Sequence, residues 1–339
     1  MKKNRILALI LSCAMLVALA GCGGADYGTI NGKAIDADIF DAAATNAMAS
    51  YLSNGYDEQS LRDMLAKEDE SGVTGAQAIK EYCLESVQQI IGVELMAEEH
   101  NIKLTSAEKE TLAEEKATYI EQQGSRAKFV ETLKASGMTE EAFDKLQETG
   151  ALQRKIVSAI FGKGGVHEVS EEEIITDMTG NFVRVVHILV QAQANSADFA
   201  EKKAKAEAAL ARAKAGEDFT ALINEVNEDP GMTSQPDGYV FDNQGYTLDG
   251  SQMVTEFVEG AWALPVGGVS ELVQTDYGFH IIKRLPLDDS YIKANIDSYY
   301  SYYAGMAFNM ELAQLMAELD IKTNSSYDNL DMASFIPKK

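Results

Sequence analysis

The sequence predicts an α+β protein in which a small sheet-containing module interrupts a mostly helical chain. Apolar residues recur at helical spacing from Asp36 to about Phe161, whereas Phe182 to Gln191 is a nearly continuous β-branched run. Two further short strand patterns are expected to pair with each other around Tyr277-Gly278. With 339 residues, 46% of them hydrophobic and 24% charged, the chain has room for about two globular domains.

The composition excludes several function classes. A formal net charge of −24 repels phosphates, which argues against nucleic acid and against electrostatic docking on anionic lipid. An acidic surface would suit basic or cation-loaded clients, although a solvated, salt-tolerant exterior is the plainer interpretation. The three cysteines form no CxxC pair, so a disulfide framework and the common zinc modules are excluded. HExxH and GxSxG motifs are also absent, and we expect neither a metal nor a cofactor.

Residues 1–21 have the pattern of a secretory leader. Met1 to Arg5 is basic, and Ile6 to Ala20 is a mostly apolar run, shorter than the ~20 residues needed to cross a bilayer. The run ends in Leu19-Ala20-Gly21-Cys22, which resembles the lipobox of bacterial lipoproteins. The resemblance implies a cut before Cys22 and diacylation of this cysteine, and two acyl chains suffice for stable anchoring. An ordinary secretory cut or an uncleaved anchor is the alternative.

The leader places the protein outside the cytoplasmic membrane of a bacterium, where ATP is absent. Residues 22–26 would be a tether, and residues 27–161 an N-terminal helical region. This region opens with a short hairpin pattern around Asn31-Gly32. Cys83 lies on an apolar helical stripe, which predicts a buried, inert thiol.

Helix boundaries are visible along this region. Thr105 to Glu108 has the sequence of a capping box, and Thr139 caps a helix that runs toward Ile160. Phe161 to Gly165 breaks the pattern without the GxxxxGK[ST] spacing of a phosphate loop, so we expect a hinge. Residues 162–180 then form a linker, which includes a second capping box at Ser170 to Glu173.

The middle block changes period. Phe182–Gln191 suits a strand buried on both faces. Two helical segments follow, then a loop rich in Gly, Asp and Asn with a short strand near Tyr239. A helix from Met253 to Leu264 precedes two strands that pair around Tyr277-Gly278. One strand, helices and a terminal hairpin make a compact α+β domain of roughly a hundred residues.

A helix is predicted from Asp289 to about Leu319, and residues 320–339 form a polar tail. The helix carries five tyrosines: Tyr291, Tyr299, Tyr300, Tyr302 and Tyr303. We expect these tyrosines to pack against residues 27–161, so that residues 289–319 and the N-terminal region form one domain. A partly exposed client-binding surface is the alternative, since tyrosine suits amphipathic contact.

The middle block also contains an ordered series of short motifs. Val185 to Val190 (VVHILV) opens the series and Thr275 to Ile282 (TDYGFHII) closes it. The intervening motifs are Gly216-Glu217-Asp218-Phe219, Asn227-Glu228-Asp229, Gly238-Tyr239-Val240-Phe241, Gln252-Met253 with Phe257, and Gly267-Gly268-Val269-Ser270. In this order over residues 181–285 they resemble parvulin-type (PpiC/rotamase) peptidyl-prolyl isomerases. The resemblance implies a parvulin fold: a small antiparallel sheet with helices.

The flanks add a second resemblance. A lipobox, a Thr29 to Ile35 start (TINGKAI), a helical block, a parvulin insert and a closing helix are similar in layout to PrsA-type extracytoplasmic foldases. The expected architecture is therefore a parvulin domain inserted in a SurA/PrsA-like helical chaperone domain. This resemblance implies a foldase that isomerises X-Pro bonds in newly secreted or unfolded polypeptides and has chaperone activity.

The parvulin resemblance also implies catalytic residues. His187 and His280 would lie at the floor of the site, hydrogen-bonded to one another and steadied by Thr275. Asp229 would lie beside the reacting carbonyl and tune that network. A histidine on a buried strand is by default a satisfied core residue, so only the combination of these positions points to function.

Two further residues would bind substrate. Met253 and Phe257 would form the proline pocket, although residues at i and i+4 are by default the core face of a helix. Where parvulins usually carry a Gly-Gly-Asp-Leu-Gly-like loop, this chain has Gln235 to Tyr239 (QPDGY), which bears on substrate preference. The functional alternative is a holdase or peptide-binding lipoprotein whose parvulin module is catalytically idle. A solute-binding lipoprotein is disfavoured because such proteins need two α/β lobes.

Overall fold

The computed structural model describes residues 26–337, which fall into two compact units. One unit comprises the chain up to Leu95, Lys103–Gly150 and the chain from Leu315 onward. The other comprises Met96–Ile102 and Ala151–Gln314. The predicted leader, the lipobox with Cys22 and most of the tether lie outside the described residues.

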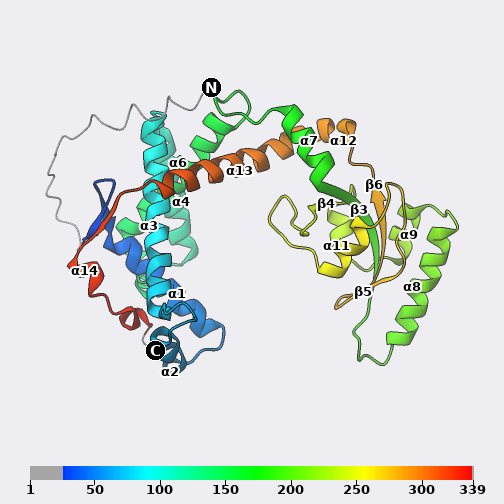
Figure 1. Cartoon of the computed structure of the whole chain (residues 1–339), viewed down its shortest axis with the longest axis horizontal. Helices are drawn as coiled ribbons and strands as arrows, with labels where there is room; N and C mark the ends of the chain where they lie inside the picture. Colours follow the sequence, from blue (N-terminus) through cyan, green and yellow to red (C-terminus); the bar gives the residue numbers. More distant parts are fainter. Residues whose placement is uncertain (1–25, 338–339) are drawn as a thin grey trace. The chain divides into compact units, whose positions relative to one another are not determined.

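The first unit contains a small sheet of order β2-β1-β7 (Figure 1). Strands β1 (Asp26–Ile30) and β2 (Lys33–Asp36) are antiparallel, with Ile30 opposite Lys33. The two intervening residues, Asn31 and Gly32, both have positive φ, at 50° and 78°. This is the requirement of a type I′ turn, and the predicted hairpin is confirmed.

The C-terminal residues are not simply a polar tail, as we expected for residues 320–339. Strand β7 (Ile321–Thr323) pairs with β1, and α14 (Ser325–Asp328) and a 3₁₀ turn at Met332–Phe335 follow. The side chains of Met332 and Ile336 are buried in the core of this unit. The sequence did not predict these elements, because isolated apolar residues among polar ones show neither helical nor strand periodicity. The strand that pairs with β7 also lies near the other end of the chain.

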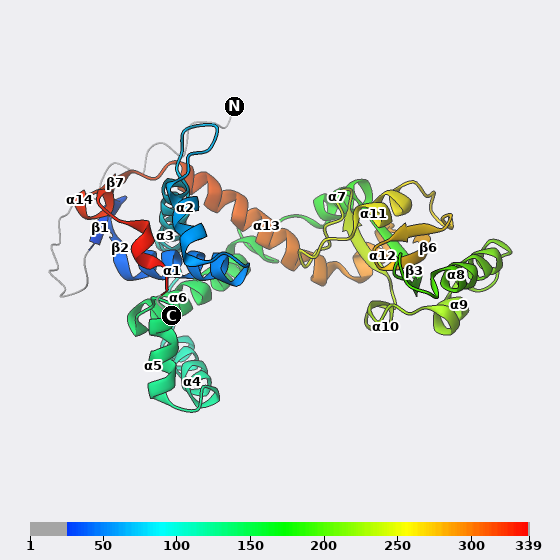
Figure 2. The same cartoon turned by 90° about the horizontal axis from the view of Figure 1, so that it is seen from below.

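Six helices form the rest of the N-terminal region (Figures 1 and 2). They are α1 (Ala37–Ser53), α2 (Glu58–Ala66), α3 (Gly75–Glu99), α4 (Ser106–Gln122), α5 (Arg126–Ala135) and α6 (Glu140–Ile156). The Thr105 hydroxyl and the Glu108 carboxylate make both bonds of the predicted capping box on α4. Cys83 is a free, fully buried thiol on α3, and burial raises its pKa to about 12, as expected for an inert core residue.

The second unit takes up the chain again at Ala151, within α6. A π-helical turn at Val157–Phe161 ends at Gly162, in the segment predicted as a break. Helix α7 (Glu171–Asn181) follows, capped by the predicted box of Ser170 and Glu173. It leads directly into β3 (Phe182–Gln191).

A four-stranded antiparallel sheet of order β4-β3-β6-β5 forms the core of this unit. The further strands are β4 (Tyr239–Asp242), β5 (Val273–Thr275) and β6 (Gly278–Leu285), and the helices are α8 (Phe199–Lys214), α9 (Phe219–Val226), α10 (Gly231–Ser234) and α11 (Thr255–Trp262). Alternation assigns the faces of the sheet. Val186, Ile188 and Val190 pack with α8 and α9, whereas Val183 and Val185 pack with α11 (Figure 1).

The predicted C-terminal helix is divided into α12 (Asp289–Ala294) and α13 (Ile296–Ala317). Three of its tyrosines, Tyr299, Tyr300 and Tyr303, are buried in a cluster with Ile174 and Met178 of α7. This part of the helix therefore belongs to the core of the second unit. These three tyrosines are packing residues and do not form the client surface that was the alternative.

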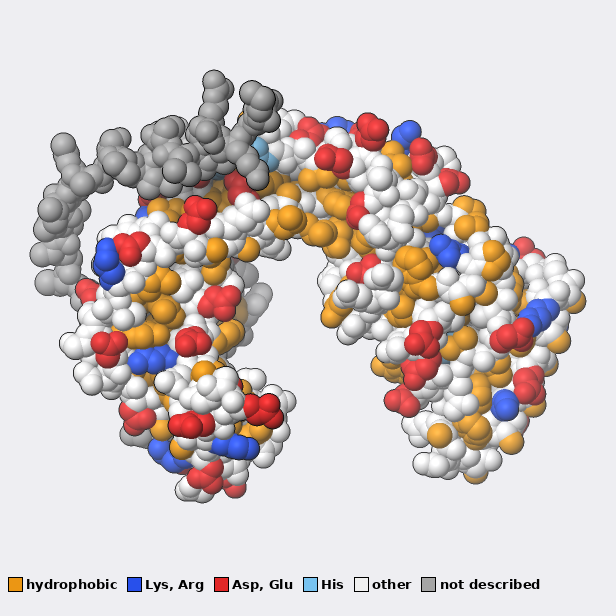
Figure 3. Space-filling model, in the orientation of Figure 1, with side chains coloured by type: hydrophobic (Ala, Val, Ile, Leu, Met, Phe, Trp, Pro, Cys, Tyr) orange, Lys and Arg blue, Asp and Glu red, His pale blue; other side chains and the backbone are white. Residues whose placement is uncertain are grey.

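The acidic composition does not concentrate in one place on the face shown in Figure 3. Asp and Glu side chains are spread over the described surface there, interleaved with Lys and Arg. Many of the basic side chains are in ion pairs, such as Lys116 with Glu140 and Asp144, and Arg212 with Glu217. On this face the charged side chains are interleaved and do not form a single acidic patch. Among residues 26–337, none of the helices has the length and apolarity to span a bilayer.

Candidate active site

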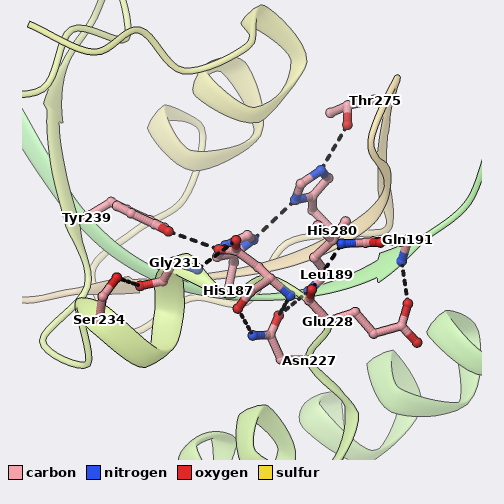
Figure 4. A network of polar contacts seen from close by, with 11 residues as sticks. His187, Leu189, Gln191, Asn227, Glu228, Gly231, Ser234, Tyr239, Thr275 and His280 are labelled. Atoms are coloured by element: carbon pink, nitrogen blue, oxygen red, sulfur yellow. Dashed lines mark hydrogen bonds and ion pairs between the residues drawn. The ribbon is translucent and has the colours of Figure 1, made fainter.

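Strand register brings two histidines together on the α11 side of the sheet. His187 of β3 lies opposite Ile282, and His280 of β6 lies opposite Leu189. The two histidines are therefore diagonal neighbours on one face, within reach of aromatic side chains. Their rings are nearly parallel, at 15°, and their Nδ1 atoms are 3.1 Å apart (Figure 4).

The hydrogen bonds around these rings form one continuous chain. The Nε2 atom of His187 lies 2.8 Å from Oδ2 of Asp229, and Nε2 of His280 lies 2.9 Å from the Thr275 hydroxyl. The Tyr277 backbone N–H donates to that hydroxyl at 3.1 Å. Each of the four ring nitrogens of His187 and His280 thus has a hydrogen-bond partner.

The direction of the chain follows from the carboxylate, which can only accept. His187 must donate from Nε2 to Asp229, so in the neutral ring its Nδ1 is an acceptor. His280 then donates from Nδ1, and its Nε2 accepts from the Thr275 hydroxyl. In this arrangement both imidazoles have a partner at each ring nitrogen in the uncharged form.

Asp229 holds its charge through three donors. Besides His187, the Tyr239 hydroxyl donates to Oδ2 at 2.9 Å and the Gly231 N–H donates to Oδ1 at 3.0 Å. The bond from His187 is the largest cause that holds the pKa of Asp229 far below its usual value, and it outweighs the opposing effect of burial. Burial, followed by the hydrogen bond to the same carboxylate, raises the pKa of the Tyr239 phenol.

The two rings are almost sealed from solvent. His187 is 4% exposed and His280 is 5% exposed. Burial is the main cause that lowers the pKa of His280 to about 4, with a further contribution from the neighbouring His187. A buried ring that stays uncharged at neutral pH can serve as a fixed dipole.

Apolar side chains cover the rings. Phe257 of α11 is buried, and its ring centroid lies 5.0 Å from that of His187 and 5.3 Å from that of His280. Met253, just before α11, is partly buried in the same cluster. Phe257 therefore lies on the helix that faces the histidines and Met253 lies just before it, and their part in binding proline stays a prediction.

Sequence reasoning missed three contributors. Tyr239 was noted only as part of a motif, and neither Gly231 nor the side chain of Asn227 was given a role. Asn227 donates from Nδ2 to the Asp229 carbonyl at 2.8 Å, and the Asp229 N–H donates to its Oδ1 at 3.1 Å. An Asn two residues before an acidic residue is a common turn signal and could have suggested this contact.

The other two histidines form a separate cluster in the same unit. His167 bonds Glu311 through Nδ1 at 2.9 Å, and the ring of His100 lies 5.7 Å from that of His167. Neither histidine belongs to the chain through Asp229. In the part of the chain that the structure describes, no group of three His, Cys, Asp or Glu side chains could hold a metal ion.

Comparison with known proteins identifies the class of domain that contains these site residues. Residues 187–285 match the family model of the rotamase, or PPIC-type PPIase, domain. The match covers the paired histidines, Asp229, Thr275 and the α11 residues. The chain therefore contains a parvulin-type domain and is a peptidyl-prolyl isomerase.

Whole-chain relatives extend the comparison. Foldase protein PrsA 3 of Bacillus cereus is 25% identical over 287 residues, covering 84% of this chain and 77% of the relative. Foldase protein PrsA of Geobacillus kaustophilus is 40% identical over 101 residues, or 30% of each chain. The crystal structure of PrsA from Bacillus subtilis covers 79% of this chain and 98% of its own, with 20% identity and a TM-score of 0.32. The chain thus contains a PPIC-type PPIase domain and is similar over most of its length to a PrsA foldase, and the α+β architecture predicted from the sequence is confirmed.

Replacing Gly231 by alanine tests the geometry around Asp229. A Cβ at this position would lie 1.9 Å from the Tyr239 hydroxyl oxygen and 3.2 Å from both Asp229 carboxylate oxygens. We expect Gly231→Ala to displace the carboxylate and lower kcat/KM for a proline peptide between about 10- and 100-fold. Gly180→Ala in α7 is the matched control, because a Cβ there meets nothing within 4 Å. Equal activity of the two variants would contradict the close packing of Gly231 against Tyr239 and Asp229.

The pKa of His280 predicts a pH dependence of stability. Because the folded state holds this pKa near 4 and an unfolded histidine titrates near 6.5, the unfolded chain binds more protons between these values. Stability contributed by the uncharged ring is therefore complete above pH 6.5 and is lost as the pH falls toward 4. Between pH 7.5 and pH 5 we expect a loss of about 2 kcal/mol in the free energy of unfolding.

Trp262 makes this measurement specific. It is the only tryptophan of the chain and lies in the second unit, so its fluorescence follows urea unfolding of that unit. His280→Gln should remove this part of the pH dependence, whereas His167→Gln, at an exposed position, should keep it. A pH dependence that is the same in the wild type and in His280→Gln would contradict the assignment.

Proposed function

We propose that this protein is a membrane-anchored, extracytoplasmic foldase that catalyses cis/trans isomerisation of X-Pro bonds in newly secreted or unfolded polypeptides. The observation that carries the proposal is the closed hydrogen-bond chain from Asp229 through His187 and His280 to Thr275, covered by Phe257. A chain of this kind offers an ionised carboxylate at one end and buried, uncharged rings behind it. Isomerisation does not need a group that is more reactive than these side chains.

The reaction sets a limited chemical demand. Amide resonance imposes a barrier of about 18–20 kcal/mol to rotation, although the two isomers of an X-Pro bond differ by only about 1 kcal/mol. A catalyst must therefore stabilise the twisted amide more strongly than either planar form. Neither a nucleophile nor a redox group is required.

The residues of the site can meet this demand. Met253 and Phe257 would hold the proline ring in an apolar environment from which water is excluded. Asp229 would lie beside the carbonyl that precedes proline, where its charge disfavours the planar, delocalised amide. As the C–N bond twists, the nitrogen lone pair becomes localised, and the low-dielectric surroundings strengthen the electrostatic effects.

The histidines would act by position and not by proton transfer. Each ring donates one hydrogen bond and accepts another in its uncharged form, so the chain keeps Asp229 ionised and oriented. Thr275 closes the chain at its far end. Catalysis by this arrangement would be retained at mildly acidic pH, because the pKa of Asp229 lies far below its usual value and that of His280 is about 4.

Anchoring would place this activity at the outer surface of the cytoplasmic membrane. The sequence Leu19-Ala20-Gly21-Cys22 after an apolar leader supports diacylation of Cys22. Two acyl chains give stable membrane attachment without a spanning helix. Polypeptides that emerge from the membrane would then meet the isomerase at high local concentration.

Asp229→Ala tests the mechanism. Since one electrostatic group is removed, we expect kcat/KM for a proline peptide to fall roughly 10- to 1000-fold. Asp229→Cys should retain part of the activity, because parvulins carry either residue at this place. Wild-type activity in Asp229→Ala would remove the residue from the mechanism.

Two further measurements complete this test. Asp63→Ala changes an exposed helical carboxylate that accepts a bond from Gln59, and it should leave isomerisation unchanged. Suppression of client aggregation should survive in Asp229→Ala, because chaperone binding does not need the twisted amide. If the wild-type protein suppresses aggregation but has no isomerase activity, the holdase alternative is correct.

Cys22→Ala tests the anchor. Without the sulfur there is no acylation site, so the protein should move from the membrane fraction to the medium or stay as an uncleaved precursor. Fractionation followed by mass spectrometry of the N-terminus distinguishes these results. Membrane association of the variant at the mature mass would contradict the lipoprotein assignment.

A further inference from the structure

One edge of strand β3 is paired with another strand over only part of its length. On one side β6 pairs with it from Arg184 to Gln191, but on the other side β4 pairs only with Phe182–Val185. The following residues remain buried, with Ile188 and Val190 fully inaccessible and Leu189 5% exposed. Backbone N–H and C=O groups in such a place need partners.

The loop before Asp229 supplies those partners. The Leu189 N–H donates to Oδ1 of Asn227 at 2.8 Å, and the Leu189 carbonyl accepts from the Glu228 N–H at 2.8 Å (Figure 4). The Gln191 N–H donates to the carboxylate of Glu228 at 2.9 Å. Two of these three partners are side chains, so the loop covers the strand edge without itself being a strand.

Asn227 also holds Asp229 at both of its backbone groups. Its Oδ1 accepts from the Asp229 N–H at 3.1 Å, and its Nδ2 donates to the Asp229 carbonyl at 2.8 Å. The orientation of the amide is fixed, because only the oxygen can accept from two N–H groups and only the nitrogen can donate to a carbonyl. One side chain therefore bonds both Asp229 and the strand that carries His187, two residues before Leu189.

Glu228 secures the same loop from the other side. Its carboxylate lies 2.6 Å from Nζ of Lys205 and 3.4 Å from Nζ of Lys202, both on α8. The amide of Gln191 additionally donates to the Glu228 carbonyl at 3.1 Å. The segment from Asn227 to Glu228 is thus fixed to β3 and to α8, while Asp229 extends from it toward His187.

An ordinary turn does not account for this arrangement. An Asx turn explains the bond from the Asp229 N–H to Asn227, since Asn and Asp side chains commonly accept from the backbone two residues on. It explains neither the bond from Leu189 nor the donation to the Asp229 carbonyl. Those two bonds connect the strand to the acidic residue.

We propose that Asn227 is a positioning residue of the isomerase, which sets the distance between the Asp229 carboxylate and His187 by bonding the edge of β3. The inference rests on the proposed role of Asp229 and adds a group that acts through it. A displacement of about 1 Å at a reacting centre can cost about 100-fold in rate, so a residue that never touches substrate can still control activity.

The principal test is Asn227→Ala in the full chain. We expect kcat/KM for a proline peptide to fall about 10- to 100-fold. Asn227→Ser should recover part of this loss, because a hydroxyl can both accept and donate and parvulins carry an S-x-D/C loop here. Asn324→Ala is the matched control in the first unit, since Asn324 likewise accepts from two N–H groups and donates to a carbonyl. It should leave kcat/KM unchanged.

A double-mutant cycle separates positioning from general support of the fold. In an Asp229→Ala background, Asn227→Ala should cause no further loss of kcat/KM, because the group through which it acts is gone. A second loss of the same size as in the wild type would overturn the proposal. Urea unfolding followed by Trp262 fluorescence identifies the fraction folded, so that kcat/KM is compared for folded protein only.

Histidine side-chain NMR gives a direct readout. The chain has only four histidines, and His100 and His167 lie in the separate cluster at Glu311. In Asn227→Ala the ring ¹⁵N resonances of His187 should shift, while those of His100 and His167 stay in place as internal references. Unchanged His187 resonances together with wild-type kcat/KM would overturn the inference. If the wild-type protein itself had no isomerase activity, the proposed function would fail instead.

Discussion

The hydrogen bond between His187 and His280 is the contact on which the candidate site depends. It joins the two longest strands of the sheet at diagonal positions and requires both rings to stay in a place that is almost sealed from water. Asp229 fixes the direction of the hydrogen bonds, because a carboxylate can only accept. His187 donates to it and accepts from His280, and Thr275 completes the same sequence.

This requirement explains the rest of the second unit. The sheet must be covered on both faces, because an exposed ring would hydrate and titrate near its usual pKa. Helices α8 and α9 cover one face with the even-numbered residues of β3, and α11 brings Phe257 against the histidines on the other. The loop at Asn227 closes the strand edge that β4 leaves open. The same few elements therefore pack the core, supply hydrogen-bond partners for the backbone and exclude water from the site.

Much of the fold was readable from local patterns because each pattern has a local cause. The Asn31-Gly32 hairpin needs positive φ at both turn residues, and both capping boxes need only residues three apart. The motif order likewise identified His187, Asp229, His280 and Thr275, whose mutual bonds the structure then gives. The C-terminal strand β7 was not readable, since its register depends on β1, which lies at the opposite end of the chain.

By itself, the sequence determined the α+β class, the parvulin-type module and the residue types of its site. The α+β class follows from periodicity and turn chemistry, which act over short distances, whereas the module and its site residues follow from the resemblance of the ordered motifs to parvulins. Only the tertiary structure decided that Tyr239 and Gly231 complete the Asp229 environment and that Asn227 bonds β3. It also decided that the tyrosines of α13 pack on α7. The Gly231 contact is local, since Gly231 lies two residues after Asp229. Each of the other contacts joins residues whose approach depends on strand register or helix packing, and neither is encoded in the spacing of a single segment.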